Sequence, residues 1–186
     1  MGNKTKLSEL QILSICHIVS FILVAVYGLF VNDVAEAFPS FITRMMLPAN
    51  MSIWEQTKAL VVPLSIIFPI EYFIVGKKFV NFIPAHLIIA FSLPMLTLGV
   101  YHIHNMFFES MSLEGPQIIL SLTLLIAAFL ASILFVTSEV DMRKYALVFM
   151  ILYFGLNIAY LFFMFFPPRI ETFYDPIHRI FGPAYK

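Results

Sequence analysis

The chain has 186 residues, of which 61% are hydrophobic and 12% are charged, and its 11 basic and 11 acidic side chains give a formal net charge of zero. Soluble domains carry roughly 25% charged residues, so this chain has too few charged side chains to cover a surface that faces water. We therefore expect the lipid bilayer to surround most of the chain. The zero net charge argues against the basic surface that binds nucleic acid, and a single cysteine, Cys16, excludes an intrachain disulfide.

Five apolar runs are long enough to cross the membrane as helices, because a hydrocarbon core of about 30 Å requires roughly 20 helical residues. They cover about residues 10–31, 54–75, 79–101, 116–138 and 145–166. The first run exceeds the roughly 7–15 residues of a signal-peptide core, so we interpret it as a retained span that ends at Asn32-Asp33. The sequence thus predicts a single all-α domain, a polytopic transmembrane bundle of five helices, with a tail over residues 167–186. Residues 38–47 fit either a short interfacial helix or a loop.

The short connections predict how the bundle is oriented. Five spans place the termini on opposite sides of the membrane. The N-terminal side has six basic residues in three short segments at helix ends, namely Lys4, Lys6, Lys77, Lys78, Arg143 and Lys144. Basic residues at such positions are typical of the cytoplasmic side. We therefore expect a multi-pass protein of the cell membrane with a cytoplasmic N-terminus and an extracytoplasmic C-terminus.

The stretch from Asn50 to Lys58 is the most polar piece beside a long apolar run. Ser52 and Glu55 fit a capping box, in which the serine accepts from the N3 amide and the glutamate reaches back to the N-cap amide. Glu55 and Lys58 have the i,i+3 spacing of a helical ion pair, and Trp54 suits the aromatic belt of a membrane interface. Two interpretations fit: a capped helix that enters the membrane, or a site where Glu55 carries a proton or binds a ligand beside Lys58.

On the predicted outer face this stretch meets the end of the third span and the tail. The polar site expected there consists of Asn50, Trp54, Glu55, Lys58, His102, His104, Tyr174, Asp175 and His178. Aromatic and branched residues in the tail are unusual for a disordered segment. We expect the tail to fold over the outer face as a lid; the alternative is that it lies along the lipid headgroups.

The pattern His102-x-His104 raises the question of a metal. In a helix the two rings point about 200° apart, whereas in an extended segment they lie on one side. Glu109 and His178 are further candidate ligands, and histidine with carboxylate suits zinc, iron or manganese. The alternative is a pair of interfacial histidines bonded to headgroups or loop carbonyls.

A second candidate pair, Glu71 and His86, flanks the turn at Gly76-Lys77-Lys78. Ionisable residues within a membrane point to function by default. A structural Glu–His hydrogen bond would also satisfy both side chains, and Glu71 could alternatively extend toward Lys77 and Lys78. His17, in the first span, is a further ionisable residue at membrane depth.

The motif Asn50-x-Ser52-x-Trp54-Glu55-x-x-Lys58 and a tail with Pro167-Pro168, Asp175-Pro176 and Gly182 resemble an uncharacterised family of small bacterial integral membrane proteins, defined as a domain of unknown function. The resemblance spans nearly the whole chain and implies about five spans and a membrane location, with no activity. Met51 stands where similar sequences are expected to have a further acidic residue, which argues against a pair of carboxylates at Glu55.

Two functional classes remain open. One is a membrane-embedded enzyme or a binder of a small molecule, lipid or metal at the outer polar site. The other is a structural or accessory membrane protein whose polar residues are helix caps and interfacial anchors. P-loop, G-x-S-x-G, H-E-x-x-H and dinucleotide signatures are missing from the sequence, so it identifies no cofactor. We favour the binding class.

Overall fold

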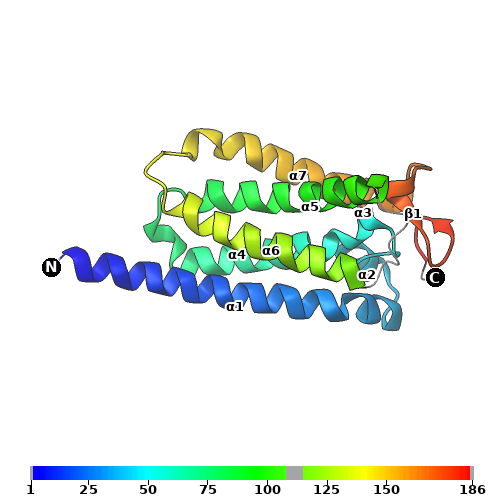
Figure 1. Ribbon diagram of the computed structural model, residues 1–186, viewed down its shortest axis with the longest axis horizontal. Helices are drawn as coiled ribbons and strands as arrows, with labels where there is room; N and C mark the ends of the chain where they lie inside the picture. Colours follow the sequence, from blue (N-terminus) through cyan, green and yellow to red (C-terminus); the bar gives the residue numbers. More distant parts are fainter. Residues whose placement is uncertain (1, 108–114, 185–186) are drawn as a thin grey trace.

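The computed structural model describes the backbone of residues 2–107 and 115–184 and the side chains of residues 9–107 and 120–184. The chain is almost entirely helical, and its long helices lie side by side along one axis (Figure 1). The long helices are α1 (Gly2–Ala37), α4 (Lys58–Ile74), α5 (Phe82–Phe107), α6 (Gly115–Val136) and α7 (Arg143–Phe165). Helix α5 packs against α4, α6 and α7, and α1 packs against α4 and α6. The two termini lie at opposite ends of the bundle (Figure 1).

Within the described residues, four helical segments are long and apolar enough to cross a membrane. They are Glu9–Ala37, Ile53–Ile74, Phe82–Phe107 and Arg143–Phe165. The side-chain-resolved part of α6, Leu120–Val136, is apolar but shorter. Large hydrophobic side chains on the outside of the bundle, such as Ile18, Phe73 and Ile158, are more than half exposed. So much exposed apolar surface is untenable in water, and the chain is a membrane protein.

Shorter elements gather at the end of the bundle that holds the C-terminus. They are α2 (Phe41–Met46), α3 (Ile53–Gln56), the 3-10 turn η2 (Glu171–Phe173) and the strands β1 (Tyr174–Asp175) and β2 (Ile180–Phe181). Residues 38–47, whose sequence fitted either a helix or a loop, thus contain the helix α2. The Ser40 hydroxyl caps this helix by accepting a hydrogen bond from the Thr43 amide. The strands form an antiparallel hairpin with Tyr174 opposite Phe181. At the other end, a 3-10 turn, η1 (Gly76–Lys78), joins α4 to α5.

The first helix differs from its predicted end. Asn32-Asp33 does not stop α1, which continues to Ala37. The reason is that the Asn32 side chain does not turn back on its own backbone but exchanges hydrogen bonds with the Gln56 side chain, at 3.1 and 3.2 Å. The two polar residues therefore join α1 to α3 inside the bundle instead of ending a span.

Three groups of buried side chains form the core along the bundle axis. The central group includes Leu64, Leu93 and Leu125. A second, near the α4–α5 turn, includes Leu13 and Phe82. The third surrounds Trp54 and contains Val61, Leu156, Tyr160 and Phe173. The third group brings the tail into contact with α3, α4 and α7, and thereby positions the candidate site.

Candidate ligand-binding site

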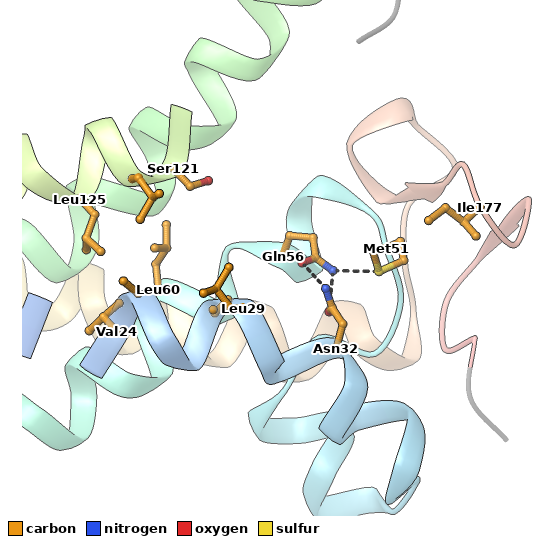
Figure 2. A pocket seen from close by; sticks show the side chains of 13 residues that line it. Val24, Leu29, Asn32, Met51, Gln56, Leu60, Ser121, Leu125 and Ile177 are labelled. Carbon is orange, nitrogen blue, oxygen red and sulfur yellow. Dashed lines mark hydrogen bonds between the residues drawn. The ribbon is translucent and has the colours of Figure 1, made fainter. Parts of the chain in front are cut away.

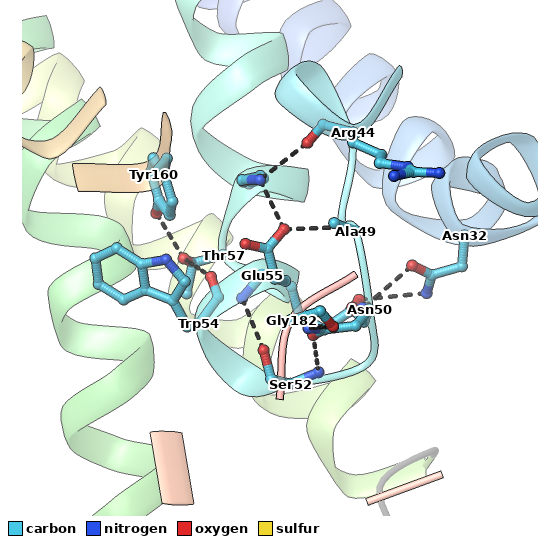
Figure 3. A network of polar contacts seen from close by, with 12 residues as sticks. Asn32, Arg44, Ala49, Asn50, Ser52, Trp54, Glu55, Thr57, Tyr160 and Gly182 are labelled. Carbon is cyan, nitrogen blue, oxygen red and sulfur yellow. Dashed lines mark hydrogen bonds and ion pairs between the residues drawn. The ribbon is translucent and has the colours of Figure 1, made fainter. Parts of the chain in front are cut away.

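The centre of the polar cluster is an ion pair between Glu55 and Lys58. The Lys58 Nζ lies 2.6 Å from Glu55 Oε2, and both residues are almost completely buried, with exposed fractions of 0% and 3% for Lys58 and Glu55. Lys58 also donates to the carbonyl of Arg44 at 3.1 Å (Figure 3), and its Nζ lies 5.9 Å from the centre of the Tyr160 ring. The predicted i,i+3 pair is confirmed, and its charges are enclosed by protein.

The predicted capping box is only half right. The Ser52 hydroxyl accepts from the Glu55 amide at 3.4 Å, as expected. Glu55 does not reach back to the Ser52 amide, because its Oε2 accepts from the Ala49 amide at 2.8 Å. The Ser52 amide instead donates to Asn50 Oδ1 at 2.8 Å. The carboxylate thus holds the preceding loop against the helix, while Asn50 takes over the cap.

Trp54 does not lie in an interfacial belt. It is 7% exposed and contacts the rings of Tyr160, Phe163 and Phe173, with centroid separations of 4.9, 5.5 and 5.1 Å. The tail supplies Phe173, which covers the indole. Beside it, the Thr57 hydroxyl donates to the Trp54 carbonyl and also bonds the Tyr160 hydroxyl, at 2.6 and 2.5 Å (Figure 3).

Asp175 attaches the tail to the loop before α3. This fully buried carboxylate accepts from the Met51 amide at 2.9 Å, from the amides of Ile177 and His178 at 2.8 and 2.9 Å, and contacts His178 Nδ1 at 2.8 Å. Burial would raise the pKa of Asp175, but these hydrogen bonds outweigh it and hold the pKa below its usual value of 3.8.

Two further hydrogen bonds fix the end of the tail. Asn50 Nδ2 donates to the Gly182 carbonyl at 2.7 Å, and the Ala184 amide donates to the Ala49 carbonyl at 2.9 Å. Gly182 has a φ of +93°, which a residue without a Cβ adopts at little cost. That conformation turns the chain back past the loop.

Of the predicted histidines, His178 joins the polar cluster through Asp175, whereas the other two lie on α5. His102 and His104 both lie within α5, so their rings point to different sides, and His102 Nε2 bonds the Thr172 hydroxyl at 2.9 Å. His178 is engaged with Asp175, and Glu109 lies outside the described residues. The proposed metal ligands therefore do not converge in the part of the chain that is described. The Tyr174 ring packs on the Phe181 ring of the other hairpin strand, with a centroid separation of 5.3 Å.

The second predicted pair, Glu71 and His86, is in contact, with His86 Nε2 at 3.3 Å from Glu71 Oε2. The favoured Glu–His contact therefore forms, and the alternative approach of Glu71 to Lys77 and Lys78 does not. Lys78 pairs with Glu9 at 3.1 Å, and Lys77 Nζ lies over the ring of Phe73. These lysines reach outward from the turn, whereas Glu71 turns into the bundle.

A cavity of about 360 Å³ lies beside the polar cluster, and no sequence pattern predicted it. Its described lining residues come from α1, the loop before α3, α3, α4, α6 and the tail: Val24, Ala25, Gly28, Leu29, Asn32, Met51, Gln56, Ala59, Leu60, Ser121, Leu122, Leu125 and Ile177. Figure 2 shows the apolar side chains Val24, Leu60 and Leu125 along one part and the Asn32–Gln56 amide pair at the other. The cavity therefore has an apolar body, which also includes the Ser121 hydroxyl, and a polar end formed by the amide pair with Met51 and Ile177 beyond it.

The amide pair retains hydrogen-bonding capacity toward the cavity. Each amide has two N–H groups and a carbonyl with two lone pairs. Gln56 Nε2 contacts Asn32 Oδ1, the Asn50 carbonyl and Met51 Sδ, while one of the two Asn32 N–H groups is taken by Gln56. The second Asn32 N–H and the carbonyl lone pairs are suited to a neutral hydrogen-bonding group.

Comparison with known proteins finds no matching family model, no matching curated protein and no matching solved structure. The resemblance to small bacterial membrane proteins thus stays a prediction, and the site must be interpreted from its own geometry.

Proposed function

We propose that this is an integral membrane protein of five transmembrane helices that binds a small, neutral amphipathic molecule from the bilayer at its extracytoplasmic end. The cavity between α1, α4 and α6 carries the proposal. Its volume of about 360 Å³ lies near the lower end of the roughly 300–1,000 Å³ of small-molecule sites. Like such sites, it combines apolar walls with a few polar groups at one place.

The fifth span is supported by length. Helix α6 has 22 residues, which at 1.5 Å per residue extend over about 33 Å, the thickness of a hydrocarbon core. An odd number of crossings also agrees with the termini at opposite ends of the bundle (Figure 1). The tail would then fold over the outer face, with Phe173 on Trp54 and Asp175 on Met51.

The ligand is neutral because the described lining residues carry no charge. An ionised headgroup would lose its hydration there without gaining a partner. An alcohol or carbonyl group can instead exchange hydrogen bonds with Asn32, while an alkyl or isoprenoid chain contacts Val24, Leu60 and Leu125. A membrane lipid or lipophilic metabolite of that kind can enter from the bilayer.

A structural role is the second candidate, and the Glu55–Lys58 pair favours it for the polar cluster itself. Both charges are enclosed and have internal partners, which leaves little for a ligand to contact. The cluster instead holds the loop and tail residues Met51, Gln56 and Ile177 that line the cavity. In our proposal the polar cluster supports the ligand site and does not form it.

Substitution of Gly28 with phenylalanine is expected to block binding. A Cβ at Gly28 meets nothing within 4 Å, so the ring can extend into the cavity without displacing the helix. We expect labelling by a photoreactive, diazirine-bearing medium-chain alcohol to fall about tenfold, equivalent to about 1.4 kcal/mol. The measurement is mass spectrometry of peptides from α1 and α4 after irradiation.

Gly155→Phe is the matched control. A Cβ at Gly155 also meets nothing within 4 Å, and this glycine lies on α7, away from the cavity. Both substitutions place a phenylalanine at a helical glycine, so labelling that is lost in the Gly28 variant and kept in the Gly155 variant reflects the cavity and not a general effect of the ring. Equal labelling of the Gly28 and Gly155 variants would leave the structural role as the better proposal.

The proposed orientation is tested by labelling single cysteines from outside the cell. In a Cys16→Ser background, we expect a membrane-impermeant thiol reagent to modify Ile170→Cys in intact cells and Lys77→Cys only after permeabilisation. Both positions are exposed and lie at opposite ends of the bundle. The reverse pattern would put the cavity's polar end on the cytoplasmic side.

A further inference from the structure

At the other end of the bundle, three ionisable side chains meet inside the protein. His17 from α1, Glu71 from α4 and His86 from α5 are each no more than 3% exposed. Each offers one ligand atom, and these atoms all lie within 4.8 Å of one another. Among the residues whose side chains are described, no other group of three histidine, cysteine or carboxylate side chains meets this condition.

The charge of Glu71 requires a positive partner. A carboxylate this deep in an apolar bundle is costly unless it is paired. The neighbouring lysines do not supply one, because Lys78 pairs with Glu9 and Lys77 lies over Phe73. The contacts of Glu71 are the Ser20 hydroxyl, which donates to Oε1, and the two histidines.

The hydrogen bond of His86 points to a cation. His86 Nδ1 lies 2.7 Å from the Phe82 carbonyl, and a carbonyl only accepts, so Nδ1 carries the hydrogen. In neutral His86 the Nε2 lone pair then faces a Glu71 oxygen 3.3 Å away. Two lone pairs at that separation repel each other unless a positive species lies between them.

We propose that His17, Glu71 and His86 bind a divalent transition-metal ion of the zinc class. Ligand–metal distances of about 2.0–2.2 Å place two donors of one tetrahedral ion roughly 3.3–3.5 Å apart. The His86–Glu71 separation of 3.3 Å agrees with this. His17 Nδ1 is 3.7 Å from Glu71 Oε1 and also 3.1 Å from the Leu13 carbonyl, a contact that it would give up to bind the ion. A proton shared by His86 and Glu71 is the alternative occupant, and measurement of bound zinc distinguishes the two.

The surrounding groups are those that commonly orient metal ligands. Metal-bound histidines usually donate their other ring N–H to a carbonyl, carboxylate or hydroxyl. His86 has the Phe82 carbonyl for this purpose, and His17 Nε2 lies 3.0 Å from the Ser132 hydroxyl. Two imidazoles and one carboxylate match zinc and ferrous iron, and the fourth position is open to the Ser20 hydroxyl or to water.

Aromatic rings hold both imidazoles in place. The His86 ring stacks on Phe82 at 3.8 Å and meets the edge of Phe68 at 4.2 Å. His17 contacts Phe129 at 5.6 Å. The triad joins α1, α4 and α5, so an ion bound there would connect three helices, two of which are already joined by the Ser20–Glu71 hydrogen bond.

The test uses full-length protein purified without a polyhistidine tag, stripped with chelator and then given Zn²⁺ alone. We expect about one zinc per chain by elemental analysis, and a melting temperature raised by roughly 5–10 °C at a hundredfold excess over Kd. Glu71→Gln and His86→Gln are expected to lose both effects. Without metal, Glu71→Gln should be at least as stable as the wild type, because it removes the unpaired charge.

His102→Gln is the matched control, a histidine on the same helix as His86 but outside the triad, and it should bind zinc like the wild type. Wild-type protein that retains no zinc, or triad variants that retain it fully, would overturn the proposal. Should the variants fail to fold, Co²⁺ added to the wild type provides a second measurement. The visible absorption of four- or five-coordinate cobalt supports the site, and the spectrum of the aqueous ion contradicts it.

Discussion

Replacing Lys58 with methionine is expected to lower the free energy of unfolding by about 3–5 kcal/mol, the usual cost of breaking a buried ion pair. Methionine fills a similar volume, so the loss comes from charge and not from a cavity. It leaves the Glu55 carboxylate 3% exposed, with the Ala49 amide as its remaining donor. Denaturant or thermal unfolding in detergent, followed by the fluorescence of Trp54, measures the change.

Glu55→Gln should lower the free energy of unfolding by a similar amount, because it leaves the buried charge of Lys58 without its partner. Glutamine can complete a capping box, and if Glu55 served only as a cap the change would be mild. Here Glu55 neutralises a lysine that is fully enclosed, and the Arg44 carbonyl and the Tyr160 ring cannot replace that charge. The cap interpretation and the structure thus predict different outcomes for one substitution.

The double variant Lys58→Met/Glu55→Gln separates charge from shape. With both charges removed, most of the lost stability should return, because buried ion pairs contribute little over apolar replacements. Lys78→Ala is the control, since its pair with Glu9 is half exposed and such pairs contribute about 0–1 kcal/mol. A double variant as unstable as the sum of the single ones would show that the two residues are not coupled.

The helices could be predicted because their signal is local. Apolar runs of sufficient length with polar breaks place α4 at Lys58–Ile74 and α7 at Arg143–Phe165, within a few residues of expectation. Two helices continue past their predicted ends: α5 extends to Phe107, and α1 passes Asn32, which bonds Gln56 from another helix. Local composition contains no information about that partner.

The contacts within the candidate site were less predictable, because local sequence does not indicate partners from other parts of the chain. The spacing of Glu55 and Lys58 is a local feature, and their pair forms. The burial of Trp54 depends on Phe173, more than a hundred residues later. The meeting of His17 with Glu71 and His86 depends on how α1 packs against α4. The sequence signal for this cluster was a histidine within an apolar run, and that signal does not predict which residues the histidine contacts.

Acidification is expected to release the tail from Trp54, and the pKa of Asp175 determines the pH at which the release begins. Its pKa is lowered in the folded protein, chiefly by hydrogen bonds from the Met51 and His178 amides that outweigh burial. A lowered pKa means that the contribution of Asp175 is fully present above its unfolded value of 3.8 and is lost as pH falls through the folded value. We expect Trp54, the single tryptophan, to keep its buried emission at pH 5 and to shift to the red only below pH 4, as Phe173 leaves it.

Asp175→Asn should release the tail at neutral pH and remove this acid transition. The amide is neutral and presents one acceptor oxygen where the carboxylate accepts from three amides and contacts His178. The loss is at least that of one hydrogen bond to a charged group, about 1.5–3 kcal/mol. Asp141→Asn is the control, because Arg143 lowers the pKa of Asp141 to about 2 but this exposed carboxylate lies at the other end of the bundle. If the Asp175→Asn protein kept the buried emission of Trp54 from pH 7 down to pH 3, the apolar contacts of Phe173 alone would hold the tail in place.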